Sequence, residues 1–188
     1  MTARDDAAGR QPVTAEPLTD RDGGPTPWEL ARERLEHPEL PRTYWLATVR
    51  PDGRPHLMPI IGAWFDEALH FLCGRGTRKG RNLLDEPRCV IGTGSTTLPS
   101  LDLVIEGVAV AVTDTDDLQR VTDRFHAATT WPLEVRDGGV HGPNAPTAGP
   151  PPYALFRLTP STVFGLPGMT GMEQFGPEEL PRPTRWQF

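Results

Sequence analysis

Six short apolar runs, separated by turn residues, constrain the fold of this chain more than any other feature of its sequence. They cover residues 44–49, 56–65, 69–73, 88–94, 101–112 and 153–158, the last of which can extend to residue 164. Their β-branched and aromatic residues are typical of strands. Between the first two runs, Pro51 presets φ and Gly53 accepts a positive φ, which predicts a tight turn. The sequence therefore predicts a mainly β fold: a six-stranded, closed or nearly closed antiparallel barrel with peripheral helices.

Three helices are predicted from capping residues and apolar periodicity: residues 26–37, 78–85 and 114–128. Thr26 and Glu29 form a Thr-x-x-Glu capping box, and Pro27 suits the first helical position. Thr77 is the expected N-cap of the second helix, which Pro87 stops. All three helices lie outside the six strand-like runs, so we expect them at the periphery of the barrel.

The chain divides into one domain and two terminal segments. Residues 1–25 are polar and lack periodicity, so we expect disorder there. Residues 26–166 form the expected barrel domain, in which residues 130–152 are a Pro- and Gly-rich loop. Residues 167–188 form an irregular tail that still carries aromatic side chains, which predicts that the tail docks on a surface.

A basic, glycine-rich segment at residues 74–82 follows the strand predicted for 69–73 and contains no acid. Lys79 lies within it and is the single lysine among 19 lysine and arginine residues. Glycines allow close backbone approach, a helix N-terminus directs N–H groups at an anion, and arginine binds phosphate with a fork of donors. The segment thus resembles a phosphate cradle; the alternative is a solvated basic turn. The candidate ligand-binding residues are Arg75, Thr77, Arg78, Lys79 and Asn82.

The remaining composition excludes several classes of protein. A net charge of −6 argues against nucleic-acid binding, which needs a broad cationic face. No apolar run approaches the length of about 20 residues that spans a bilayer. Cys73 and Cys89 lie in strand-like runs without metal-ligand spacing to the histidines, so we expect no metal site and no disulfide. Buried thiols of this kind suit a reducing, cytoplasmic protein.

A series of motifs between Trp45 and Gly107 has the order and spacing found in one known family. It comprises residues 46–49, 52–55, 64–66, 69–71, 77–83, 87 and 105–107. In these motifs the chain resembles the pyridoxamine 5′-phosphate oxidase-like superfamily of FMN-binding split barrels. The C-terminal residues 184–188 are similar to the ending of actinobacterial members.

This resemblance implies a homodimer with a flavin, FMN, in a cleft between the subunits. It implies that residues 77–79 contact the cofactor phosphate and that the strand beneath the isoalloxazine ring contacts it partly through the backbone. The residues of that strand are His56, Met58, Pro59 and Ile60. It also favours the subunit interface and its cleft as the destination of the C-terminal tail, the alternative being a tail folded on its own barrel.

Several positions depart from the pattern of true pyridoxamine 5′-phosphate oxidases. Met58 and Ala63 stand where those enzymes carry Arg and Lys, and Leu101–Asp102 replace an Arg-Gln pair. The Arg-Leu-His substrate segment has no counterpart. We therefore expect no oxidation of pyridoxamine 5′-phosphate, and the cations left to bind phosphate are Arg75, Arg78, Lys79 and Arg81.

The predicted function is a flavin-dependent oxidoreductase acting on a small molecule. The cofactor would supply the redox chemistry, so no catalytic acid or base is assigned. One alternative is a reductase that uses the deazaflavin coenzyme F-420 in the same cleft. Another is a non-catalytic flavin- or haem-binding protein.

Overall fold

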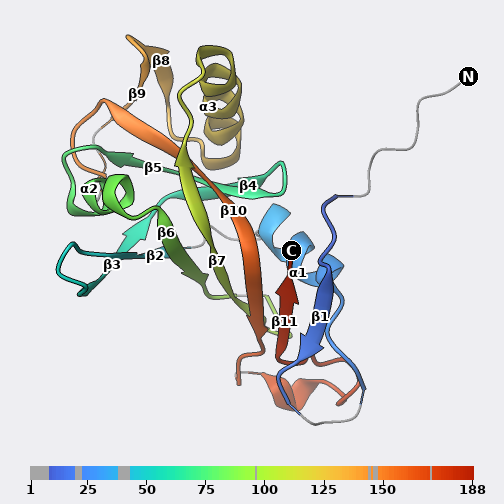
Figure 1. The fold of residues 1–188 in the computed structure, drawn as a ribbon. Helices are drawn as coiled ribbons and strands as arrows, with labels where there is room; N and C mark the ends of the chain where they lie inside the picture. Colours follow the sequence, from blue (N-terminus) through green and yellow to red (C-terminus); the bar gives the residue numbers. More distant parts are fainter. Residues whose placement is uncertain are drawn as a thin grey trace, which may run out of the picture.

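The computed structural model describes residues 9–19, 23–37, 43–95, 97–143, 145, 148–169 and 171–188 (Figure 1). Its elements follow the chain in this order: β1 (Thr14–Pro17), α1 (Trp28–Glu36), β2 (Tyr44–Val49), β3 (Pro55–Ile60), β4 (Gly62–Phe65), β5 (Ala68–Gly74), α2 (Arg78–Asp85), β6 (Arg88–Thr93), β7 (Asp102–Ala111), α3 (Thr115–Thr129), β8 (Glu134–Arg136), β9 (Gly139–His141), β10 (Tyr153–Leu166), a 3₁₀ turn (Met172–Gln174) and β11 (Thr184–Gln187).

The strands form one antiparallel sheet that curls into a split barrel, as the sequence predicts. Around the barrel the order is β3-β2-β6-β7-β10-β5-β4. The long strand β10 holds the two halves together, because it pairs with β7 and, through its first residues, with β5. The six predicted strands correspond to β2, β3 with β4, β5, β6, β7 and β10; the described residues add β1, β8, β9 and β11.

The single strand predicted for residues 56–65 is divided into two strands, β3 and β4. Because these two pair with different neighbours, the barrel is open between them. β3 pairs with β2 and β4 pairs with β5, so the chain changes partners at Ile61. Gly62 permits the bend: a Cβ there would lie 3.0 Å from the Tyr44 ring. As a result β3 is an edge strand that runs beside β5 without pairing to it in the described structure.

The helix α2 covers this opening. It packs against β2 on one side and β5 on the other. Its bounds match the prediction, and the Thr77 side chain caps it by accepting from Gly80 N. Because strand β5 ends at Gly74 and α2 begins at Arg78, the basic segment lies at the mouth of the split.

The N-terminal segment differs from the expected disorder, because β1 lies within it. β1 pairs with β11 from the opposite end of the chain, and β11 pairs with β10. The C-terminal tail is thus folded onto its own barrel. Trp186 is fully buried and packs edge-on against Trp28, with ring centroids 5.6 Å apart. This position is the one expected for a tail folded on its own barrel, and the expectation that the tail also lies at a subunit interface stays a prediction.

The expected capping box of α1 is wrong. Pro27 is the N-cap of α1, with no capping side chain. The Thr26 hydroxyl instead accepts from Arg182 N at 2.7 Å, and Thr26 O accepts from Trp186 Nε1 at 3.0 Å. The C-terminal tail therefore binds the polar groups of Thr26 that the capping box was expected to use.

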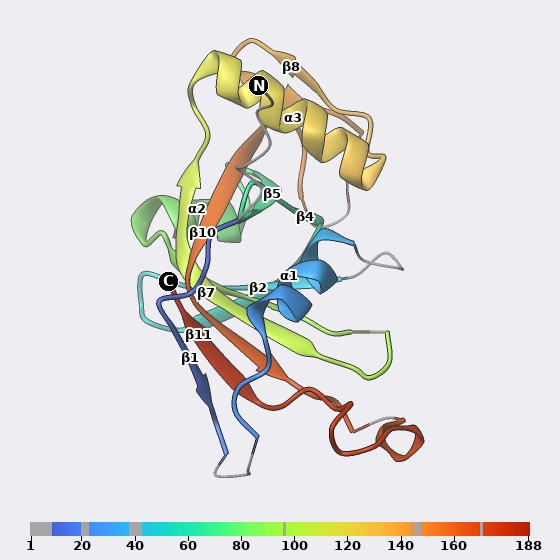
Figure 2. The ribbon, with the colours of Figure 1, turned by 90° about the vertical axis from the view of Figure 1, so that its right-hand side faces the viewer.

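Helix α3 and the β8–β9 hairpin form a separate cap at one end of the molecule, far from the β1–β11 pair (Figures 1 and 2). The hairpin lies inside residues 130–152, which were expected to be a loop. Its turn is built by Asp137 and Gly138, both with positive φ, a signal typical of a tight hairpin. A second apolar cluster, which includes Val121, Phe125 and Val140, joins this cap to the barrel.

Candidate functional site

The turn from β5 into α2 is fixed by its own hydrogen bonds. The Thr77 hydroxyl donates to Gly74 O at 2.7 Å and accepts from Gly80 N at 3.2 Å. A Cβ at residue 80 would lie 2.5 Å from Gly74 O, so glycine is required there. The hydroxyl proton of Thr77 is committed to the turn, and its side chain therefore shapes the cradle while the helix N-terminus supplies the anion-attracting dipole.

Lys79 is buried, with 2% of its surface exposed. Burial is the main cause that lowers the pKa of its ammonium, and the Cys73 thiol acts in the opposite direction. The alternative of a solvated basic turn is wrong for this residue. A lysine held in such a place suits an anionic partner, since an opposite charge offsets the cost of burying the ammonium.

Asn82 ties α2 to the first strand of the barrel. It is fully buried, and its Nδ2 donates to Thr48 Oγ1 on β2 at 2.9 Å. Its Oδ1 has no hydrogen-bond partner among the described residues. A buried acceptor without a partner is uncommon in a folded protein and needs an explanation. Asn82 thus orients the helix and leaves one atom able to accept from a ligand.

His56, on β3, lies next to the Thr48 and Asn82 pair. Its Nδ1 is 3.5 Å from Thr48 Oγ1. Burial lowers the pKa of the imidazole, and the charges of Arg50, Lys79 and Arg78 lower it further. His56 is therefore neutral near pH 7. Arg50, Lys79 and Arg78 therefore all lie within electrostatic range of this ring.

Arg50 is a member of this cluster that the sequence analysis missed. It follows β2 directly, and its Nε is buried without a hydrogen-bond partner in the described part of the chain. A buried guanidinium donor needs an acceptor, which an anionic ligand would supply. Its sequence signal was its place between a strand and the Pro51-Asp52-Gly53 turn, where strand ends carry functional side chains.

The other predicted residues divide between the site and its surroundings. Met58 and Ile60 lie on the face of β3 that carries His56, whereas Pro59 lies on the opposite face, paired with Trp45. Arg75, Arg78 and Arg81 are exposed, and none takes part in an ion pair among the described residues. The structure thus brings Thr48, His56 and Asn82 into contact, with Arg50, Arg78 and Lys79 close enough to act on the charge of His56.

The donors present fit a phosphorylated cofactor. Arg50 Nε is a buried donor without a partner among the described residues, and the buried ammonium of Lys79 lies on α2. The unpaired outer edge of β3 runs past the same place and can donate and accept through its backbone. The arrangement can therefore hold a phosphate at α2 and a planar ring along β3.

Two other kinds of site receive no support. No three His, Cys, Asp or Glu side chains of the described chain are arranged to hold a metal ion. In the same part of the chain, no helix combines the length and the apolar character needed to cross a membrane.

Known proteins provide an independent comparison. A family model described as pyridoxamine 5′-phosphate oxidase matches residues 30–166. Among solved structures, an F-420 reductase is 25% identical, with a TM-score of 0.50 over 70% of this chain and 94% of that chain. A pyridoxamine 5′-phosphate oxidase-related, FMN-binding protein from Nostoc punctiforme is 21% identical, with a TM-score of 0.52 over 74% and 82%.

A haem-binding protein from Mycobacterium smegmatis is 18% identical, with a TM-score of 0.53 over 74% of this chain and 55% of that chain. At this level of identity, the Nostoc and Mycobacterium structures show the shared fold alone. No curated protein sequence matches the chain. Because the family model covers residues 30–166, well over half of the sequence, this chain belongs to the pyridoxamine 5′-phosphate oxidase family.

Proposed function

We propose that this protein is a flavin-dependent oxidoreductase that binds FMN at the mouth of the split and acts on a small molecule. The observation that carries the proposal is the buried Lys79 on α2, in a turn that also carries the exposed Arg78, together with the Arg50 Nε at the end of β2, which is buried without a partner among the described residues. When bound, FMN would supply hydride or electron transfer through its isoalloxazine ring. The protein's own groups bind the phosphate, orient the ring and control access.

Each element of the site has a role in this proposal. Arg50, Arg78 and Lys79 neutralise the phosphate, and Thr77 and Gly80 hold the turn in shape. The edge of β3 supports the ring through its backbone, with Met58 and Ile60 beneath it. His56 is neutral and can share one hydrogen bond with the ligand. No side chain here is assigned as a catalytic acid or base.

The proposal includes a homodimer built on the outer face of the sheet. Four large apolar side chains on the outward side of β2, β3 and β7 are exposed: Trp45 46%, Leu57 57%, Val108 44% and Val110 61%. Between them on β6, a Cβ at Gly92 would meet open space. An apolar patch of this kind marks an interaction surface. A second copy fits it because the patch continues into β2 and β3, the strands that carry the cofactor site.

A second candidate is a reductase that uses coenzyme F-420. The structure of an F-420 reductase is 25% identical to this chain, and the exposed Arg75 and Arg81 could receive a longer acidic tail. A third candidate is a non-catalytic flavin- or haem-binding carrier, which the shared fold of the haem-binding protein supports. In each case a reducing, cytoplasmic setting suits the two buried thiols.

Calorimetric titration with FMN, riboflavin and F-420 tests the cofactor. We expect FMN to bind tighter than riboflavin by at least about tenfold, because charged hydrogen bonds contribute about 1.5–3 kcal/mol each. Arg50→Gln should remove most of this preference. Arg185→Gln is the matched control, since Arg185 Nε is also buried without a partner among the described residues. Equal affinity for FMN and riboflavin would overturn the phosphate site; tighter F-420 binding would select the second candidate.

The same samples test the assembly and the reaction. Sedimentation should give a dimer, and a monomer that binds FMN with full affinity contradicts the interface part of the proposal. We expect no turnover of pyridoxamine 5′-phosphate, because Met58 and Ala63 replace charged groups of that active site. Steady-state oxidation or reduction of any small molecule separates an enzyme from a carrier.

A further inference from the structure

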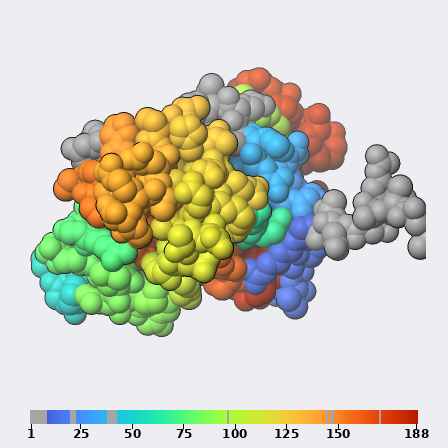
Figure 3. All heavy atoms as spheres, turned by 90° about the horizontal axis from the view of Figure 1, so that it is seen from above, coloured from blue at the N-terminus to red at the C-terminus, as the bar shows by residue number. Residues whose placement is uncertain are grey.

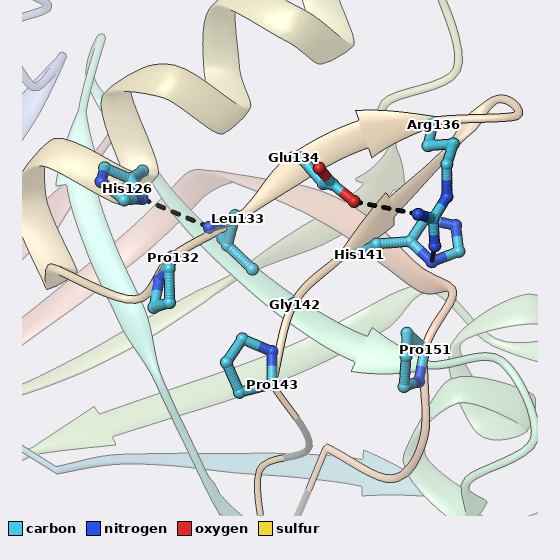
Figure 4. Close-up of a pocket in the computed structure, with 9 residues that line it drawn as sticks. All are labelled: His126, Pro132, Leu133, Glu134, Arg136, His141, Gly142, Pro143 and Pro151. Atoms are coloured by element: carbon cyan, nitrogen blue, oxygen red, sulfur yellow. Dashed lines mark hydrogen bonds and ion pairs between the residues drawn. The ribbon is translucent and has the colours of Figure 1, made fainter.

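A hollow lies between the end of α3 and the β8–β9 hairpin, on the cap that the cofactor proposal does not use (Figure 4). We name it the α3–β9 hollow. Its volume is about 390 Å³, which is near the small end of the range of about 300–1,000 Å³ typical of ligand pockets. Nine residues line it: His126, Pro132, Leu133, Glu134, Arg136, His141, Gly142, Pro143 and Pro151.

The walls of the hollow are held in place before any ligand arrives. Pro143 O accepts from Trp131 Nε1 at 3.2 Å and from Tyr153 Oη at 3.1 Å. Leu133 N donates to His126 Nδ1 at 3.2 Å. Three of the lining residues are prolines, whose φ is fixed. A preformed hollow keeps the entropic cost of binding small.

The polar groups of the hollow are mainly donors. In Figure 4, His126 lies on one side and Arg136 with His141 on the other. His126 accepts at Nδ1, so its neutral ring carries the proton at Nε2. His141 Nδ1 is 3.1 Å from Arg136 Nη2, which places the proton of the neutral ring at Nε2 there too. Each imidazole therefore keeps one N–H, and Arg136 keeps further donors.

Glu134 is the one carboxylate among the lining residues, and it is engaged. Its Oε1 lies 3.2 Å from Arg136 Nη1. The rest of the lining is apolar and flat, formed by the prolines and Leu133. A ligand that matches these walls carries a single acceptor group on a flat apolar body.

We propose that the α3–β9 hollow is a binding site for a small organic anion of this kind, an aromatic carboxylate. Its carboxylate is held by Arg136 and the imidazole of His141, and its ring packs against the prolines, with the His126 imidazole on the opposite side. The site is distinct from the cofactor cradle and does not depend on it. Residues 148–151 connect the two sites. Ala148 O accepts from Gly74 N at 2.7 Å, next to the basic turn, and Pro151 lines the hollow.

Figure 3 shows this arrangement from outside: the yellow and orange surface of α3 and the residues after it adjoins the green surface around α2. A ligand in the hollow would therefore bind near the cofactor turn without entering the split.

Titration of the full-length protein with benzoate tests the proposal. Calorimetry should give a Kd on the order of 1 mM, as expected for so small a ligand. Benzyl alcohol, the neutral analogue, should bind at least about tenfold more weakly. In the NMR spectrum, benzoate should shift the ring resonances of His126 and His141 and leave those of His37 unchanged.

Variants separate recognition from folding. Arg136→Gln should weaken benzoate binding at least about tenfold. Arg54→Gln is the matched control, because Arg54 also pairs with a carboxylate two residues before it, Asp52, at 2.7 Å. Glu134→Gln should strengthen binding, since it removes the charge that opposes the anion. The proposal fails if benzoate shows no saturable binding, if Arg136→Gln binds it as well as the natural protein does, or if Glu134→Gln weakens it.

Discussion

Two regions of this protein are rich in arginine, one around α3 and one around α2, and they differ in whether their arginines form ion pairs. Around α3, arginines pair with acids: Asp66 accepts from Arg120 and Arg124, and Asp117 accepts from Arg120 within the helix and from Arg157 on β10. Around α2, Arg75, Arg78 and Arg81 take part in no ion pair within the described residues, although the chain has a net charge of −6. Arginines that are already paired hold elements together, whereas the exposed, unpaired arginines around α2 are the ones that our proposal assigns to the ligand.

The two regions also differ in the state of their histidine. His70 is fully buried beside Arg157, whose Nε donates to His70 Nε2 at 3.2 Å, and its ring stacks on Phe65 with centroids 3.9 Å apart. His56 is half-buried at the mouth of the split. Burial lowers the pKa of both, yet only His70 is locked into a network that spans β5, β10 and α3. The first histidine therefore serves the fold, and the second can serve a ligand.

The largest expected effect lies in the paired region, at His70. Burial, followed by the charge of Arg157, lowers its pKa to about 4, while Asp66 opposes this and Arg124 and Arg120 add to it. Because the unfolded imidazole binds a proton near pH 6.5 and the folded one does not, the stability from this group is complete above pH 6.5. It is lost as the pH falls toward 4, by up to about 3 kcal/mol.

Urea unfolding between pH 4 and pH 7 measures this loss. His70→Gln keeps an acceptor for Arg157 but does not titrate, so its free energy of unfolding should fall less steeply in this range. Carboxylates titrate in both proteins, and the difference between the two slopes isolates His70. His37→Gln, at an exposed position, should follow the natural protein. Identical slopes for His70→Gln and the natural protein would refute the assignment.

The second effect lies in the ligand-facing region, at Lys79. Lys79→Met should weaken FMN binding by about 10- to 100-fold, because a buried charge paired with phosphate contributes about 1.5–3 kcal/mol. The unfolding free energy of the apo protein should change by less than the free energy of FMN binding does. Burial lowers the pKa of Lys79, so the folded state already disfavours its charge.

Two measurements decide this prediction: FMN titration and urea unfolding of the apo protein. A loss of stability with unchanged FMN affinity would mean that Lys79 is structural, and the contrast between the two regions would collapse. Lys79→Arg is the sharper variant. If the site needs a compact ammonium, arginine should not restore the affinity.

The smallest effect is expected at Arg120, in the paired region. Arg120→Gln removes its pairs with Asp66 and Asp117, at 2.8 and 2.6 Å. Because the Arg120 side chain is 51% exposed, solvent screens both pairs and stability should fall only slightly. FMN affinity should not change. A measurable drop in FMN affinity would show that the α3 network also shapes the cofactor site.

Local signals predicted helix α2 of the candidate site well. The N-cap Thr77 and the Pro87 stop predict its bounds, and the hydroxyl of Thr77 makes the capping bond. Where a distant partner competes, local prediction failed. Thr26 has the pattern of a capping box, but Arg182, 156 residues away, uses its hydroxyl. The single predicted strand 56–65 divides because its two halves pair with different strands.

The sequence by itself determined the mainly β class, the family, the position of α2 and the basic turn, because strand pattern, capping and turn chemistry act between near neighbours. Tertiary structure decided which charged side chains of the basic turn and its neighbours are buried and which are exposed. The hydrogen bond from Asn82 to Thr48 joins residues 34 positions apart in the sequence. The burial of Lys79 and the position of Arg50, next to the pair formed by β2 and β3, also depend on strand pairing. Burial and charge proximity depend on which strands lie side by side, and no local pattern encodes that.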